Sequence, residues 1–457
     1  MTKTMKMMKM SRGGGKTLSY LLAAAIFAAG FTVNAENNNW IGSTGGTYSD
    51  AANWSVQAPA AGVTSYVTNK VTNPFATGTT GLLGTLDLGG STQTLSSDPD
   101  NVFNNGAVVS NGTLKLTSTA EWAVGAKIIT FGAGLSATSS TVICDNGQKN
   151  NPKLYFVDGC SFVFSNTKSS QKVGYYRDSG SYTFTFYVKN RSRLEFSTPT
   201  LYLGCASRGK ATIEMDNSTF EGAGKVVLGG RLTGSAGTGT LKIENGSVFN
   251  CTGIECGTSG YAGTANITFK NSTLVAERIA RIGSTTASLA LNNLTFAPKT
   301  SGKNLFDNLS SVPITGTLTI SNTVGNVTIG SVVSSTGAFK LKGGKRLDFT
   351  AAPTYTGATT IEDGTLSFGG LSHGSKVLTV GEKGVLATDA NDTWATSITF
   401  EKGAKVLRTT KDTITLTAPT ITGIPDVGEK YVVRLVDGES SDTLTIKYRT
   451  GLLVIVQ

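Results

Sequence analysis

Two pairs of acidic residues are spaced so that they could act together on a glycosidic bond. Glu195 and Glu221, and likewise Asp216 and Glu244, are separated by roughly 27 residues, a length typical of one repeat unit. Glycoside hydrolysis needs two carboxyl groups roughly 5 to 9.5 Å apart, one as acid and the other as nucleophile or base. Acids at equivalent positions of adjacent coils would meet that separation. Exposed acids on a strand also serve solubility and protect sheet edges, and a long repeat aligns several by chance.

We expect no catalysis from these residues. The chain has no Asp-Asp pair, no Asp-Gly-Asp sequence and no arginine grouped with several acids, as a calcium-dependent lyase would have. Its single histidine, His373, lies in the Gly- and Ser-rich segment GLSHGSK without a nucleophile motif around it. We interpret His373 as an exposed loop residue rather than as part of a Ser-His-Asp triad. No cofactor or metal is expected, because one histidine and no paired CxxC units cannot supply zinc ligands.

The most aromatic and basic stretch of the chain covers residues 175–196, beginning with Tyr175, Tyr176 and Arg177. It could form an outward platform on which sugars stack. Alternatively, its apolar residues fill a core while Arg191 and Arg193 are solvated. Period-two apolar spacing is what a core strand requires, so we favour the core interpretation. The residues that carry this spacing are Tyr182, Phe184, Phe186 and Val188.

The five cysteines do not form a disulfide framework, because their number is odd and their spacing is uneven. They are Cys144, Cys160, Cys205, Cys251 and Cys256. The segment CTGIEC could close a small loop in an oxidising compartment. Buried thiols that replace Val or Ala in a β core are an equal alternative.

The first 35 residues have the features of an export signal. Five basic residues precede an apolar run from Leu18 to Val33, and VNAE offers a cleavage site after Ala35. An uncleaved anchor is the alternative, but the run is short for a membrane span and no second one follows. Cleavage would lower the formal charge from +10 to +5, because five basic and no acidic residues leave. We expect a secreted or cell-surface protein without a nucleic-acid partner or a later transmembrane segment.

A corner motif recurs along the chain: apolar, polar, Asn or Asp, Gly or Ser, Ser or Thr, apolar. Its asparagines recur at a nearly constant interval of roughly 27 residues, and the motif returns around Gly364 in IEDGTL. Towards the C-terminus the period shortens to about 20 residues. The predicted structural corner positions are Asn190, Asn217, Asn245, Asn271 and Gly364.

The composition, which is poor in runs of Leu, Glu, Ala and Lys, predicts no helices beyond the N-terminus. The repeat predicts an all-β fold, a parallel β-helix. Each coil holds two or three strands of about four residues, too few to bury an apolar face alone. Stacking in parallel gives every strand backbone partners and joins the inward side chains into one column. A β-sandwich would not keep one corner motif in register over so many repeats. We expect about 17 coils and a rod near 80 Å long.

Four segments are predicted. Residues 1–35 form the signal peptide, residues 36–110 the N-terminal cap and first coils, residues 111–410 the parallel β-helix, and residues 411–457 the C-terminal capping strands. Trp40 and Trp54 would cover the first coil. The last segment is expected to contribute three strands that cover the final coil, since exposed strand edges promote aggregation.

One stretch, YTGATTIEDGTLSFGG, resembles the autotransporter-associated β-strand repeat. The matching positions are Tyr355, Thr356, Gly357, Thr359, Ile361, Gly364, Thr365, Leu366 and Gly369. The stretch NWIGSTGGTYSDAANWS is similar to the Trp-rich opening of exported bacterial proteins that carry such repeats. The resemblance implies a right-handed parallel β-helix that is exported and surface-exposed or released. Family members are commonly carried by a C-terminal barrel of about 12 strands, but only about 54 residues follow Gly403.

The sequence therefore predicts a secreted structural or adhesive β-solenoid that contacts extended partners along its outer face. The expected partners are polysaccharides or other surface proteins. Two alternatives stay open. One is a polysaccharide lyase or glycoside hydrolase of the β-helix type, and the other is an autotransporter-like passenger that uses a separate barrel.

Overall fold

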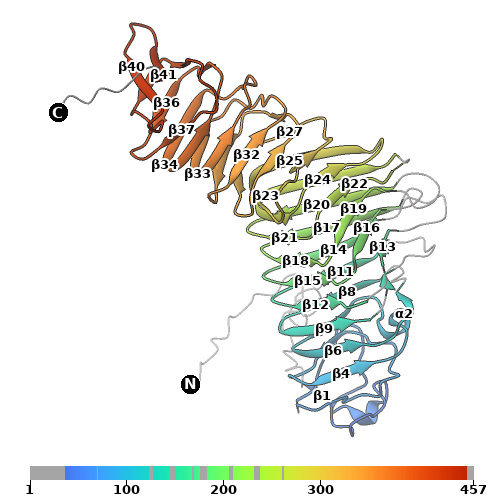
Figure 1. The fold of residues 1–457 in the computed structure, drawn as a ribbon. Helices are drawn as coiled ribbons and strands as arrows, with labels where there is room; N and C mark the ends of the chain where they lie inside the picture. The colour runs from blue at the N-terminus through green and yellow to red at the C-terminus, as the bar shows by residue number, and fades with distance from the viewer. Residues whose placement is uncertain are drawn as a thin grey trace, which may run out of the picture.

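Short strands of alternating apolar and polar residues stack in parallel around one axis. In the computed structural model, strands make up 53% of the chain and helices 2%, and the coils form a β-solenoid of about 14 turns (Figure 1). The predicted parallel β-helix is confirmed. The structure describes residues 37–68, 70–122, 127–140, 142–143, 151–166, 169–174, 183–204, 209–230, 237–259 and 262–449.

The first face of the solenoid is a parallel ladder in which each strand pairs with its equivalent one coil later. Its strands are β1 (Asn38–Asn39), β2 (Thr64–Tyr66), β3 (Thr85–Asp87), β5 (Ala107–Ser110), β8 (Ile128–Phe131), β11 (Lys153–Phe156), β14 (Thr183–Lys189), β17 (Lys210–Asp216) and β20 (Thr238–Glu244). The first halves of β23 (Thr264–Ala276) and β25 (Thr286–Pro298) continue it, followed by β27 (Val312–Pro313) and β30 (Val333–Ser334).

The second face follows the first around a corner and runs through nearly the whole rod. Its strands are β4 (Thr92–Leu95), β6 (Gly112–Leu116), β9 (Leu135–Ser139), β12 (Ser161–Phe164), β15 (Arg193–Phe196), β18 (Thr219–Gly222) and β21 (Val248–Asn250). The second halves of β23 and β25 follow, then β28 (Thr317–Ser321), β31 (Ala338–Lys342), the first halves of β33 (Thr359–Ser367) and β34 (Val377–Ala387), β36 (Ser397–Phe400) and β39 (Thr420–Thr422).

The third face closes each coil. Its strands are β7 (Glu121–Trp122), β10 (Val142–Ile143), β13 (Gln171–Val173), β16 (Thr200–Leu203), β19 (Lys225–Leu228), β22 (Ile254–Cys256), β24 (Ile279–Arg281) and β26 (Phe306–Asp307). Beyond them lie β29 (Val327–Ile329), β32 (Arg346–Phe349), the second halves of β33 and β34, and β37 (Lys405–Leu407). Equivalent inward residues of the three faces form one apolar column, such as Leu194, Phe220, Phe249 and Leu274 on the second face.

The number of turns is lower than the 17 expected because the coils are not uniform. Asp158 and Asn190, which occupy the same corner of adjacent coils, are 32 residues apart. The two ends of the chain also form caps instead of coils. At 4.8 Å per turn, 14 turns correspond to a rod of about 67 Å.

The rod changes direction near β25 and β27, where the coils shorten (Figure 1). Strand pairing on the first face falls there to a single bridge, between Leu291 and Ile314. Thr315 N still donates to Leu291 O at 2.9 Å, but Pro313, two residues earlier on the same side, has no N–H to donate to β25. The loss of the first-face ladder therefore coincides with a proline.

Aromatic rings close the N-terminal end. Trp40 and Trp54 form an antiparallel bridge, and both pack on Phe75 with ring centroids 4.8 and 5.8 Å away. The composition predicts no helix here, but the 3-10 turn η1 (Ala51–Asn53) and the one-turn helix α2 (Pro99–Val102) occur in this region. Both start at an Asp that accepts a backbone N–H, and α2 has Pro in its first turn, so local capping outweighs composition.

A mixed four-stranded sheet closes the C-terminal end, with β35 and β38 parallel and the other two pairs antiparallel. Its order is β35 (Asp392–Thr393), β38 (Ile414–Ala418), β41 (Asp442–Tyr448) and β40 (Tyr431–Val436). Two of the three predicted capping strands are thus β40 and β41, and the third falls outside the described residues. Among the described residues, no helix has the length and apolar character needed to span a bilayer.

Candidate functional surface

The four predicted corner asparagines lie between the first and second faces of successive coils. The residues that directly precede these asparagines pair with one another on successive coils. They are Lys189, Asp216, Glu244 and Lys270. All four adopt the left-handed conformation, which Asn tolerates better than most residues. The φ angles are 57° at Asn190, 46° at Asn217, 54° at Asn245 and 48° at Asn271.

Side-chain hydrogen bonds follow this corner along the rod. Asn190 donates to Asp158 at 2.8 Å, Asn245 to Asp216 at 3.0 Å, and Asn293 to Asn271 at 2.9 Å. The corner is therefore supported by Asn–Asp bonds as well as by the Asn–Asn bonds that a pure asparagine stack would form.

Gly364 occupies a different corner, between the second and third faces. It lies inside β33 with a φ of 102°, and a Cβ there would be 2.5 Å from the carbonyl oxygen of Lys345. The motif IEDGTL resembles the asparagine corners because both corners require a left-handed residue between two strands. A six-residue pattern cannot distinguish one corner of a coil from another.

The acid pairs lie on adjacent coils, as the spacing predicts. Glu195 is opposite Glu221, and Asp216 is opposite Glu244. Each acid already has a polar partner. Glu195 pairs with Arg193 at 2.5 Å and Glu221 accepts from Asn250 at 2.7 Å. Asp216 accepts from Asn245 at 3.0 Å, and Glu244 pairs with Lys242 at 3.2 Å.

The prediction of an exposed His373 is wrong. Its side chain is only 1% exposed, and Nε2 lies 2.9 Å from Asp392 Oδ1. The ring packs against Trp394 and Phe368, with centroids 4.0 and 4.9 Å away. Asp392 and Trp394 follow His373 by about one coil, so a local view of the Gly- and Ser-rich segment misses the contacts that bury it.

The stretch from Tyr175 to Tyr182 lies outside the described residues. The remaining apolar members, Phe184, Phe186 and Val188, are fully buried, which confirms the core interpretation for them. Outward from the same strand, Tyr187 stacks on Tyr155 of the preceding coil with centroids 4.5 Å apart. Because the two rings stack on each other along the rod, they do not form a joint flat platform for a sugar.

Three cysteines, Cys160, Cys251 and Cys256, are buried and free, so CTGIEC does not close a loop. Burial raises the pKa of each thiol to about 12. Cys144 and Cys205 lie outside the described residues. Among the described residues, no group of three His, Cys, Asp or Glu side chains is placed to hold a metal ion.

A threonine row on the second face was not predicted. Its members point outward at equivalent positions of successive coils and are interrupted once, by Lys340. The row, which we call the threonine ladder, is Thr273, Thr295, Thr319, Thr360, Thr379, Thr399 and Thr422. Spacing between parallel strands places these hydroxyls about 4.8 Å apart, except across Lys340. The sequence signal was the recurrence of Thr in second-face strands such as TLTI, VLTV and SITF.

A groove of about 390 Å³ runs beside the ladder at the corner of the second and third faces. Its hollow lies at Gly381, the residue directly after Val380. Val380 pairs with Ile361 on one neighbouring coil and with Phe400 on the other. Glu362 and Glu401 come directly after these two residues, so they lie on either side of Gly381. Glu362 pairs with Lys340 at 3.1 Å. Thr360, Thr379, Glu382 and Lys383 complete the lining.

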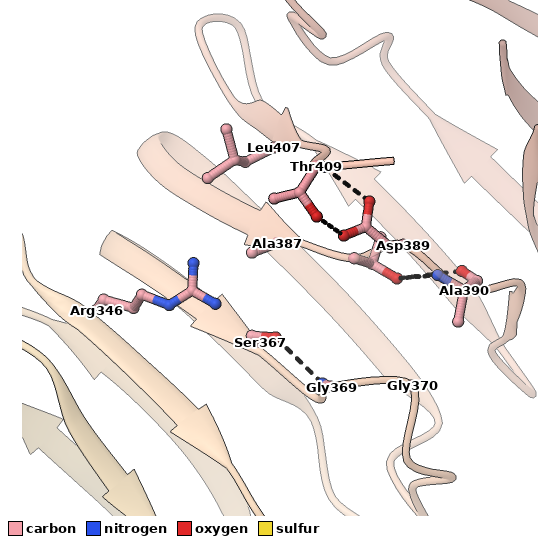
Figure 2. Close-up of a pocket in the computed structure, with 10 residues that line it drawn as sticks. Arg346, Ser367, Gly369, Gly370, Ala387, Asp389, Ala390, Leu407 and Thr409 are labelled. Carbon is pink, nitrogen blue, oxygen red and sulfur yellow. Dashed lines mark hydrogen bonds between the residues drawn. The ribbon is translucent and has the colours of Figure 1, made fainter. Parts of the chain in front are cut away.

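A second hollow of about 380 Å³ lies over the third face near the C-terminal cap (Figure 2). Its carboxylate, Asp389, points at Thr409 and accepts from the backbone N–H groups of Thr409 and Thr410 at 2.8 and 3.1 Å. Burial would raise the pKa of Asp389, but the hydrogen bonds from Thr409, Thr410 and Arg408 outweigh it and hold the pKa below its ordinary value. Arg346 in this hollow pairs with Asp348 at 2.9 Å. Asp389 and Arg346 thus both have polar partners within the chain.

No protein-family model, curated protein or solved structure matches this chain. The class that the structure defines is a parallel β-solenoid.

Proposed function

We propose that the protein is a secreted or cell-surface rod that binds extended polysaccharides along its second face and does not catalyse a reaction. The observation that carries this proposal is the threonine ladder beside the Gly381 groove. A threonine hydroxyl both donates and accepts hydrogen bonds, and glutamate oxygens accept from sugar hydroxyls. Each contact is weak, but a polysaccharide would engage many coils at once, so the contacts act together.

Export is supported by the basic and apolar pattern before Ala35 and by the resemblance to autotransporter-associated repeats. A non-catalytic role is supported by the contacts of the two acid pairs, because each acid already has a polar partner. Glu195 and Glu244 form ion pairs with Arg193 and Lys242. Glu221 and Asp216 accept hydrogen bonds from asparagine side chains.

The test is a polysaccharide panel screened for binding and for hydrolysis with the chain after Ala35. Replacing Thr360, Thr379 and Thr399 with Val removes three ladder hydroxyls and keeps the β-branched shape. The matched control replaces Thr212 and Thr240, which pair outward on the first face, in the same way. We expect at least a tenfold loss of affinity for the ladder variant and none for the control. Equal losses in both would contradict the proposal.

A polysaccharide-active enzyme is the second candidate, and the groove favours it. Glu362 and Glu401 flank Gly381 from opposite sides, so their backbones are about 9.6 Å apart, two strand spacings. Glycosidases of the inverting type hold carboxyl groups up to about 9.5 Å apart. Glycan turnover that disappears in Glu362→Gln or Glu401→Gln would establish this function and overturn the binding-only proposal.

A further inference from the structure

The C-terminal sheet ends in an open strand edge. β40 pairs on one side only, with β41. Arg449 N donates to the directly opposite Lys430 O at 2.9 Å, so the even-numbered residues that follow Lys430 also bond towards β41. The backbone N–H and C=O groups of Tyr431, Val433 and Leu435 therefore point away from β41. Among them, Tyr431 N–H donates to Gly428 O at 3.3 Å. Within the described part of the chain, no strand lies beyond them.

The side chains of β40 are apolar on both faces of the sheet. Tyr431, Val433 and Leu435 pack partly buried against the core, whereas Val432 and Val436 are 49% and 42% exposed. Natural edge strands are usually blunted by several charges, a proline or a bulge. Within β40, Arg434 is the sole charged residue.

The two ends of the rod differ in this respect. At the N-terminal end, Trp40, Tyr48 and Trp54 are buried around Phe75 and close the first coil. At the opposite end, β40 lies at the tip of the rod (Figure 1), and none of the described strands pairs with its outer edge. The asymmetry favours contact between two C-terminal ends over contact between a C-terminal and an N-terminal end.

We propose that β40 pairs antiparallel with β40 of a second copy, so that two rods join tail to tail in one continuous sheet. The edge is self-complementary about a twofold axis at Val433. Val433 then bonds reciprocally with Val433 of the second copy through its outward N–H and C=O groups. Tyr431 lies opposite Leu435 of the second copy, and Leu435 N–H donates to Tyr431 O, because Tyr431 N–H already donates to Gly428 O at 3.3 Å. On the exposed face, Val432 lies opposite Arg434, so no like charges are directly opposite. A twofold contact of this kind closes at two copies and leaves no edge for growth.

This inference goes beyond the proposed function and does not depend on it. A tail-to-tail dimer would extend the second face over two rods and give any repeating partner two attachment regions. Bivalent contact raises apparent affinity without new contacts in either rod.

The test measures the association of the chain after Ala35 by sedimentation and by electron microscopy with a label at the N-terminal end. We expect a reversible dimer with a label at each outer tip. Val433→Pro removes an N–H that points away from β41, so it should abolish the dimer and preserve the monomer fold. Val432→Lys places a cation opposite Arg434 and should weaken dimerisation about tenfold, because two symmetric repulsive pairs form.

A charge reversal and a distant control make the result specific. Val432→Glu places an anion opposite Arg434 and should keep or tighten the dimer. A purely hydrophobic contact would instead be weakened by this substitution. Val324→Lys changes a valine that is 37% exposed at mid-rod and should have no effect. A monomeric wild type, assemblies longer than two rods, or dimers insensitive to Val433→Pro would overturn the proposal. So would dimerisation that appears only when residues 450–457 are removed, since that segment would then be the occupant.

Discussion

The guanidinium of Arg408 joins the last coils to the C-terminal cap. Its side chain is fully buried, and Nε donates to Asp389 Oδ1 of the preceding coil at 3.2 Å. The other two nitrogens donate to the carbonyl oxygens of Asp412 at 2.8 Å and of Ile446, in β41, at 3.3 Å. Replacing Asp389 with Ala would leave this buried charge without its carboxylate.

Removing one partner of a fully buried ion pair costs about 3–5 kcal/mol. The side chain of Asp389 is 33% exposed, so water partly takes its place. We therefore expect Asp389→Ala to lower the free energy of unfolding of the cap by about 2 kcal/mol, which corresponds to a change of roughly 30-fold in its opening equilibrium. Each coil contacts only its neighbours, so the loss should stay local.

Hydrogen exchange followed by mass spectrometry measures this directly. Amides of β41 should exchange about 30-fold faster in Asp389→Ala, while those of β17 stay unchanged. Adding Arg408→Met should recover part of the protection, because no unpaired buried charge remains. As a control, Arg193→Ala breaks a surface pair and should change protection by less than about 0.5 kcal/mol. Unchanged exchange at β41, or faster exchange along the whole rod, would refute the reasoning.

Three further predictions concern the corners, the thiols and acid pH. Asn245→Ala should lower the free energy of unfolding, measured by thermal denaturation, by about 1 kcal/mol, because Ala is strained at a positive φ. Asn245→Gly should lower it less. Cys251 and Cys256, whose pKa is raised to about 12, should resist alkylation in the folded protein at neutral pH and react in denaturant, as mass spectrometry would show. The lowered pKa of Asp389 adds stability to the folded state that is lost as the pH falls below about 3.8. Hydrogen exchange should therefore show that acid loosens β41 in the wild type and much less in Asp389→Asn.

The coil repeat could be predicted because its signal is periodic. Left-handed corners need Asn, Asp or Gly, and a corner at Asn190, Asn217 and Asn245 in each coil makes the motif recur at a regular interval. The alternation in residues 183–189 likewise predicts which side chains enter the core. The same reasoning failed to assign Gly364 to its own corner, because every corner makes similar demands on backbone conformation.

The candidate surface could be predicted only in part. The acid pair of Glu195 and Glu221 follows from the period, but their partners Arg193 and Asn250 depend on which side chains meet across coils. The burial of His373 depends on Trp394, which comes about one coil later in the chain.

Local sequence determined that this protein builds coils, because strand alternation and left-handed corners are properties of a few consecutive residues. Tertiary structure decided where the hollow at Gly381 opens, how Asp389 meets Arg408, and which strand edge stays open at β40. Those features arise between coils, from residues one period apart, and contact between them exists only once the coils are stacked in register.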